Sequence, residues 1–144
     1  MSKRIEDLDP LVQPKARTFL SLIPIPYVVT STLRTLEEQG ALYARGRKPL
    51  DEVNALRSRA GMYLLSASEN TYTVTNCDGV KYKSNHQGGR ALDVVPANVA
   101  GNPIWPPATD PRWEMLAKCG EAAGFSWGGR WNPPDLPHYE MENI

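Results

Sequence analysis

The segment SNHQGGRALDVVP, residues 84–96, carries the pattern on which the fold prediction rests. Its second half is rich in aliphatic and β-branched residues and ends at Pro96, which is typical of a strand. Alternation along that strand places Leu92 and Val94 on a core face and Asp93 on the opposite face. Because a lone aspartate is costly to bury without a partner, we expect Asp93 to face a polar or metal site.

Two glycines, Gly88 and Gly89, separate this strand from His86 and permit a tight turn. We expect that turn to place His86 and Asp93 on neighbouring strands with converging side chains. The chain's other histidine, His138, lies in PPDLPHYE, which we expect to end in a short strand. Catalytic zinc typically takes three such ligands and keeps a fourth position open. The two histidines and Asp93 therefore form a candidate metal site, for which non-haem iron is an alternative occupant.

Asp135 precedes His138 by three residues, in a segment stiffened by Pro137. A bound metal lowers the pKa of water, and a nearby carboxylate can accept the proton. We therefore interpret Asp135 as a general base. Glu140 is an alternative base or an ordinary solvated residue.

Helical patterns dominate the first half of the chain. Residues 5–23 form a helical pattern that prolines interrupt. Thr35 and Glu38 match a capping box, which predicts a helix through LEEQGALYARGR with Leu36, Leu42 and Tyr43 pointing inward. Asp51 is a candidate cap for a further helix, EVNALRSRAG.

Strand patterns gather in the second half. A first strand is predicted early, at residues 27–30 (YVVT), and an alternating stretch over residues 71–84 contains Asp78-Gly79, a hairpin signal. A proline-rich loop over residues 97–111 precedes the amphipathic segment RWEMLAKCGEAAGF. The order predicts an α+β fold, a small and mostly antiparallel sheet packed with helices, in one domain over residues 1–144.

Composition excludes several classes of protein. The 144 residues carry 16 Lys+Arg and 16 Asp+Glu, so binding of nucleic acid by charge alone is not expected. We expect no membrane span, because the longest apolar run is broken by Pro24 and Pro26. Two cysteines make no disulfide framework. The N-terminal MSKRIEDLDP shows no secretory signal, which favours synthesis in a cytoplasm.

Three blocks of sequence resemble the M15 zinc peptidases, which include D-Ala-D-Ala carboxypeptidases, dipeptidases and L-alanyl-D-glutamate endopeptidases. Residues 84–93 match the family motif S-x-H-x-x-G-x-A-x-D at every specified position. The tail WGGRWNPPDLPHYE resembles the second metal motif of the phage endolysin branch, and TSTLRTLEEQGALYARGR, residues 30–47, resembles the first block of the family. The blocks span about residues 30–140, most of the chain.

The resemblance implies a Hedgehog/D-Ala-D-Ala peptidase-like fold with zinc as cofactor. It implies that His86, Asp93 and His138 bind Zn2+ and that Asp135 is the general base, an aspartate as in the endolysin branch. Arg34 matches the arginine that faces the substrate and stabilises the oxyanion, although a surface charge at a helix entry is the alternative.

Other matched positions imply contacts with substrate. Ser84 contacts substrate or orients its loop, and Gln39 supports the site or the fold. Trp127 and Trp131 either stack on substrate or lie in the core. These four residues and Arg34 form the candidate substrate-binding set: Ser84, Arg34, Gln39, Trp127 and Trp131.

Two features depart from the family pattern. Arg130 stands where relatives often carry an acidic residue, which would change the charge of the cleft or a subsite. The segment 48–70 is longer than the corresponding link in compact relatives. Three roles are open for it: a lid, a calcium-binding or regulatory element, or a scaffold helix.

The resemblance implies a peptidase that cuts the stem peptide of bacterial peptidoglycan at the L-alanyl-D-glutamate bond. We expect the protein to be a monomer. Alternatives are a D,D- or L,D-carboxypeptidase or dipeptidase on the same peptides, and a non-catalytic zinc-stabilised binding or virion-structural module. As an endolysin, the enzyme would reach the cell wall after holin-type release from the host cytoplasm, or it would be virion-associated. A bacterial recycling enzyme is a further alternative.

Overall fold

The computed structural model describes residues 1–142, and its chain divides into two compact units. The helical unit comprises Arg34–Gln87 together with Met1, and the sheet unit comprises Ser2–Leu33 and the chain from Gly88 onward. Within the described residues, no helix has the length and apolar character needed to cross a bilayer.

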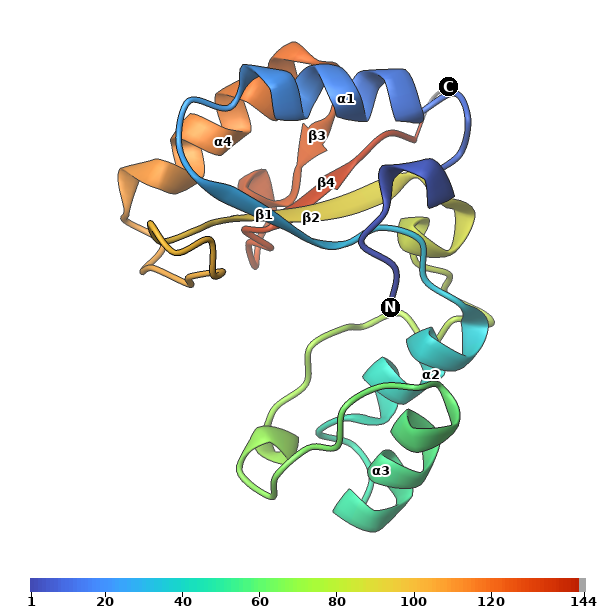
Figure 1. Cartoon of the computed structure of the whole chain (residues 1–144). Helices are drawn as coiled ribbons and strands as arrows, with labels where there is room; N and C mark the ends of the chain where they lie inside the picture. Colours follow the sequence, from blue (N-terminus) through green and yellow to red (C-terminus); the bar gives the residue numbers. More distant parts are fainter. Residues whose placement is uncertain (143–144) are drawn as a thin grey trace. The chain divides into compact units, whose positions relative to one another are not determined.

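The sheet unit is built on four antiparallel strands in the order β1-β2-β4-β3 (Figure 1). The strands are β1 Tyr27–Ser31, β2 Ala91–Pro96, β3 Ser126–Trp127 and β4 His138–Glu140. Two helices, α1 Gln13–Leu22 and α4 Pro111–Ala122, pack against each other and lie over one face of the sheet (Figure 1). The mixed architecture with a small antiparallel sheet confirms the predicted fold class.

The core lies between these helices and the sheet. Phe19 of α1 packs on Tyr139 of β4, with ring centroids 4.6 Å apart, and both residues are fully buried. Gly120 of α4 allows this packing, because a Cβ there would come within 2.6 Å of the Tyr139 ring. Burial raises the pKa of Tyr139 far above its ordinary value. Tyr139 therefore anchors β4 to the core and directs the neighbouring His138 and Glu140 to the other face.

The helical unit contains α2 Leu36–Ala44 and α3 Leu50–Arg59, with the short 3-10 helix η2 Glu69–Thr71. The predicted capping box is confirmed, because Thr35 accepts a hydrogen bond from the Glu38 N–H and the Glu38 side chain accepts one from Thr35. The segment 48–70 supplies α3 and the loop after it. Buried Arg57 holds that loop by donating from Nε to the Tyr63 carbonyl at 2.7 Å. This arrangement supports the scaffold interpretation of the segment.

Three local predictions are wrong. Leu36 is 56% exposed, because it occupies the first turn of α2 rather than its inner face. Asp51 does not cap α3, because the helix already begins at Leu50 after Pro49. No strand forms over residues 71–84 of the described chain. The Asp78 carboxylate instead accepts hydrogen bonds from two backbone N–H groups, which closes a local turn without strand pairing.

Candidate active site

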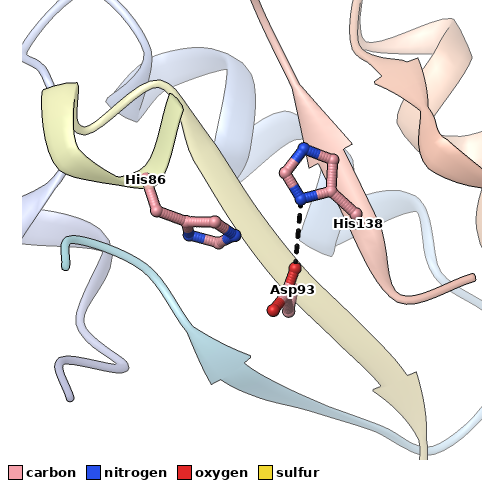
Figure 2. Close-up of side chains that lie close together, drawn as sticks. All are labelled: His86, Asp93 and His138. Carbon is pink, nitrogen blue, oxygen red and sulfur yellow. Dashed lines mark ion pairs between the residues drawn. The ribbon is translucent and has the colours of Figure 1, made fainter. Parts of the chain in front are cut away.

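Asp93 and His138 stand directly opposite each other on β2 and β4. Residues paired across antiparallel strands share a face, and here that face is opposite the one on which Leu92 and Tyr139 enter the core. Asp93 Oδ1 lies 3.5 Å from His138 Nδ1 (Figure 2). The prediction that Asp93 leaves the core face of its strand is confirmed.

His86 lies in the 3-10 helix η3 Asn85–Gly88, so the prediction that it occupies a strand is wrong. Ser84 Oγ accepts a hydrogen bond from the His86 N–H, and the Gln87 side chain accepts one from the Ser84 N–H. These side chains satisfy backbone donors that a strand would have paired with a neighbour, and the turn forms instead. Gly89, at φ +70°, then leads the chain into β2.

The three predicted metal ligands converge. His86, Asp93 and His138 each offer one ligand atom, and these atoms all lie within 4.8 Å of one another (Figure 2). Both histidines are buried, at 2% and 7% exposure, and Asp93 is partly buried. Two imidazole nitrogens and a carboxylate oxygen match the donor set of catalytic zinc sites, so the residues present fit this ion.

The electrostatics of His138 also favour a cation. Burial opposes the charged imidazole, yet hydrogen bonds with Asp93 and Glu140 and the charges of Asp93 and Asp135 raise the pKa of His138 to about 9. The surrounding carboxylates that favour this proton would favour a metal ion at Nδ1 in the same way.

Asp135 lies on the same side of the His138 ring as Asp93. Its Oδ2 is 4.0 Å from His138 Nδ1, and its side chain is 52% exposed. The Asp135 N–H donates to the Gly128 carbonyl at 2.8 Å, and the His138 N–H donates to the Asp135 carbonyl at 3.3 Å. These backbone hydrogen bonds hold the Asp135 carboxylate beside the candidate ligand His138, where water can reach it.

Glu140 is the site residue whose place the sequence did not indicate. It is 6% exposed, so the interpretation as a solvated residue is wrong. Its Oε1 lies 2.8 Å from His138 Nε2, the nitrogen on the other side of the ring from Nδ1. The i, i+2 spacing on a strand was the available signal, since it places both residues on one face.

In the helical unit, Arg34 is buried and held by Gln39. Arg34 Nη1 donates to Gln39 Oε1 at 2.9 Å, while the Gln39 amide nitrogen donates to the Cys77 carbonyl at 2.7 Å. The Arg34 N–H also donates to the His86 carbonyl at 3.0 Å. The exposed surface-charge alternative for Arg34 therefore does not hold, and Gln39 occupies a position that orients the guanidinium.

The two tryptophans have different environments. Trp127 is 4% exposed and donates from Nε1 to the Leu136 carbonyl at 2.7 Å. The indole ring of Trp127 is part of the hydrophobic core, so of the two expectations for this residue the core position holds and stacking on substrate does not. Trp131 is 43% exposed, and its ring centroid lies 5.1 Å from that of His138. Trp131 therefore keeps a surface that a bound molecule can reach, next to the candidate metal ligand His138.

Arg130, in the 3-10 helix η4 Gly128–Arg130, binds α4 rather than standing free. Its guanidinium contacts Glu121 at 3.0 Å and Glu114 at 2.8 Å and covers the Trp127 ring. Hydrogen bonds with Glu121 and Glu114 raise the pKa of Arg130 above its ordinary value. The expectation that this arginine changes the charge of a cleft is therefore not supported, because two carboxylates balance it.

Comparison with known proteins identifies similar chains. An M15 peptidase family model described as D-alanyl-D-alanine carboxypeptidase matches residues 78–141. The peptidoglycan L-alanyl-D-glutamate endopeptidase CwlK of Bacillus subtilis (strain 168) is 26% identical over 145 residues, which cover 94% of this chain and 74% of that protein.

Two solved structures share the fold. The L-Ala D-Glu endopeptidase ChiX of Serratia marcescens superposes with a TM-score of 0.57 at 22% identity, covering 96% of this chain and 83% of that one. The second structure is a variant of the vancomycin resistance D,D-pentapeptidase VanY, from the VanB-type resistance cassette, in complex with Zn(II). It superposes with a TM-score of 0.57 at 17% identity, covering 93% of this chain and 72% of that one.

The region matched by the family model contains all three converging ligands and Asp135. The similarity to CwlK and to both structures extends over almost the entire chain. The motif, the geometry of the candidate site and these comparisons together support the M15 family of zinc peptidases as the family that this chain resembles.

Proposed function

We propose that this protein hydrolyses the stem peptide of bacterial peptidoglycan, at the bond between L-alanine and D-glutamate. The observation that carries the proposal is the convergence of His86, Asp93 and His138 beside the solvent-accessible carboxylate of Asp135. The L-alanyl-D-glutamate activity of CwlK and ChiX supports the choice of bond.

The proposed roles follow from chemistry. His86, Asp93 and His138 would hold zinc, which when bound polarises a carbonyl and increases the acidity of water. Asp135 accepts the proton of the attacking water on its carboxylate and later donates that proton to the leaving amine. Its exposure suits this role, because a base must exchange protons with water and substrate. A purely zinc-stabilised module would not require such a carboxylate.

Arg34 is proposed to stabilise the oxyanion that develops on the scissile carbonyl. Its hydrogen bond to the fully buried Gln39 supports this role, since a guanidinium held in one orientation needs little reorganisation during reaction. Ser84 is proposed to act by holding the turn of His86, through the hydrogen bond from the His86 N–H. Exposed Trp131 is proposed to contact the peptide beside His138.

A D,D-carboxypeptidase is the second candidate, favoured by the description of the matching family model. Such an enzyme must hold the free terminal carboxylate of its substrate, usually with a cation. Arg130, close to Trp131 in the chain, is already bound to Glu114 and Glu121. This engagement leaves Arg130 unsuited to hold a terminal carboxylate.

The biological setting is proposed from the tail motif. The resemblance of WGGRWNPPDLPHYE to the phage branch supports an endolysin that is made in the host cytoplasm and reaches the wall after holin-type release. A virion-associated enzyme would use the same site.

The test is mass spectrometry of purified peptidoglycan digested with zinc-loaded protein, with chelator-treated protein and Asp135→Asn as controls. New L-alanine carboxyl ends paired with D-glutamate amino ends support the proposal. Release of free D-alanine would replace it with the carboxypeptidase. If several wall chemotypes give no metal-dependent product, the peptidase proposal is wrong and the non-catalytic module is favoured.

A further inference from the structure

Glu140 is a buried carboxylate that the proposed reaction does not use. It lies on β4 between Ala91 of β2 and Ser126 of β3, its partners in the sheet. Both neighbours have small side chains, which leaves room for the Glu140 carboxylate to turn along its own strand toward His138. Burial of a carboxylate is costly unless hydrogen bonds compensate, and the 2.8 Å contact with His138 Nε2 supplies one.

The two nitrogens of the His138 ring face different groups. Nδ1 lies 3.5 Å from Asp93 and 4.0 Å from Asp135, on the side where the candidate ligand atoms converge. Nε2 lies against Glu140. A neutral imidazole carries its hydrogen on only one nitrogen. If Nδ1 is to bind a metal, the hydrogen must therefore be on Nε2, where the Glu140 carboxylate can accept it.

We propose that Glu140 is a positioning residue that fixes His138 in the tautomer with Nδ1 free to bind the metal. The same hydrogen bond holds the ring plane and increases the electron density on Nδ1, as carboxylates behind metal-bound histidines do. This inference rests on the zinc site of the proposed function.

Two other roles for Glu140 fit the geometry less well. As a metal ligand it would have to reach the Nδ1 side of a ring whose opposite nitrogen it already contacts. As the general base it would need water, yet it is 6% exposed, whereas the Asp135 side chain is 52% exposed. The contact with Nε2 is the one that a positioning role requires.

The test compares Glu140→Ala and Glu140→Gln with the wild-type protein. Zinc affinity is measured by competition with a chromophoric chelator, and long-range 1H–15N NMR of the zinc-loaded protein shows which His138 nitrogen carries hydrogen. Glu140→Ala should weaken zinc binding about 10- to 100-fold. Glu140→Gln should lose less, because its amide oxygen still accepts the Nε2 hydrogen. Glu37→Gln, an exposed carboxylate on α2, is the matched control and should bind zinc as the wild type does.

The outcomes separate this inference from the proposed function. Unchanged zinc affinity in both Glu140 variants, with the hydrogen still fixed on Nε2, would overturn the inference. If Glu140→Ala does not fold, the affinity of Glu140→Gln decides, because loss of the charge alone should still weaken binding measurably. Wild-type protein that binds zinc but cuts no peptide would overturn only the proposed function. Wild-type protein that binds no zinc would overturn both.

Discussion

Asp93 and His138 face each other across the β2–β4 pair, with Oδ1 and Nδ1 3.5 Å apart. Their spacing is therefore set by backbone hydrogen bonds of the sheet, and the core packing of Leu92 and Tyr139 fixes the face on which they stand. Two of the three candidate ligands thus lie on paired strands of the sheet unit, and regular elements of this kind are where a preorganised site is expected.

Zinc should stabilise the native protein through this pair. A ligand that binds only the folded state at 100 times its Kd adds about 2.7 kcal/mol to the free energy of unfolding. We therefore expect zinc to raise Tm by several degrees, a chelator to reverse the shift, and Asp93→Ala to show no shift. Thermal melts with and without zinc check this, with Asp51→Ala, an exposed aspartate on α3, as control. A full zinc shift in Asp93→Ala would exclude Asp93 as a ligand.

Asp135→Asn should remove turnover and keep the metal. Loss of a general base typically lowers kcat about 100- to 10,000-fold. Because the side chain is half exposed, we expect the free energy of unfolding to change by no more than about 0.5 kcal/mol. Single-turnover cleavage of a stem peptide, with zinc content measured on the same sample, tests both parts. Near-normal turnover would assign the base to another residue.

Gly128→Ala should displace the backbone turn that carries Asp135 and His138. A Cβ at Gly128 would lie 2.5 Å from the Asp135 carbonyl oxygen and 3.1 Å from His138 Cβ. To avoid this clash, the turn that carries Asp135 and His138 must move, so we expect lower peptidase activity and a loss of stability of about 1 kcal/mol or more.

Gly40→Ala is the matched control for that substitution. Gly40 lies inside α2, and a Cβ there meets nothing within 4 Å. Replacing a helical glycine by alanine should stabilise the protein by about 0.5–1 kcal/mol. Denaturant unfolding and peptidase assays on both variants make the comparison. If the two variants have the same free energy of unfolding and the same peptidase activity, the turn at Gly128 tolerates a side chain.

The sequence predicted the strand of Asp93 and the convergence of the three ligands, because strand alternation and paired glycines are local signals. It did not predict the environment of Glu140, which depends on the small neighbours Ala91 and Ser126 contributed by two other strands. Trp127 and Trp131 show the same limit. Their local sequences offer no distinction, and only tertiary packing makes one of them core and leaves the other exposed.

The turn of His86 was missed for a related reason. Alternating residues after Thr71 suggested paired strands, but side chains supplied local hydrogen bonds that replaced the pairing. Asp78 accepts from the N–H groups of Val80 and Tyr82, and Ser84 accepts from that of His86. Residues of this type compete with strand ladders for backbone donors.

The start of α4 provides a prediction on pH. Asp110 caps this helix by accepting from the Arg112 N–H and also binds the Arg112 side chain at 2.8 Å. The side-chain hydrogen bonds and the backbone hydrogen bond from Arg112 lower the pKa of Asp110 from 3.8 to about 2. A carboxylate with a depressed pKa in the folded state stabilises that state fully above its unfolded pKa. This contribution is lost as the pH falls from about 4 to about 2.

Asp110→Asn isolates the charge, because asparagine remains a good helix N-cap. The wild type should have a higher Tm than Asp110→Asn at pH 6, and this difference should shrink between pH 4 and pH 2 as Asp110 becomes protonated. Thermal melts of both proteins over this range measure the difference and cancel the titration of other carboxylates. A difference that stays constant to pH 2 would show that cap geometry, and not the charge of Asp110, stabilises the start of α4.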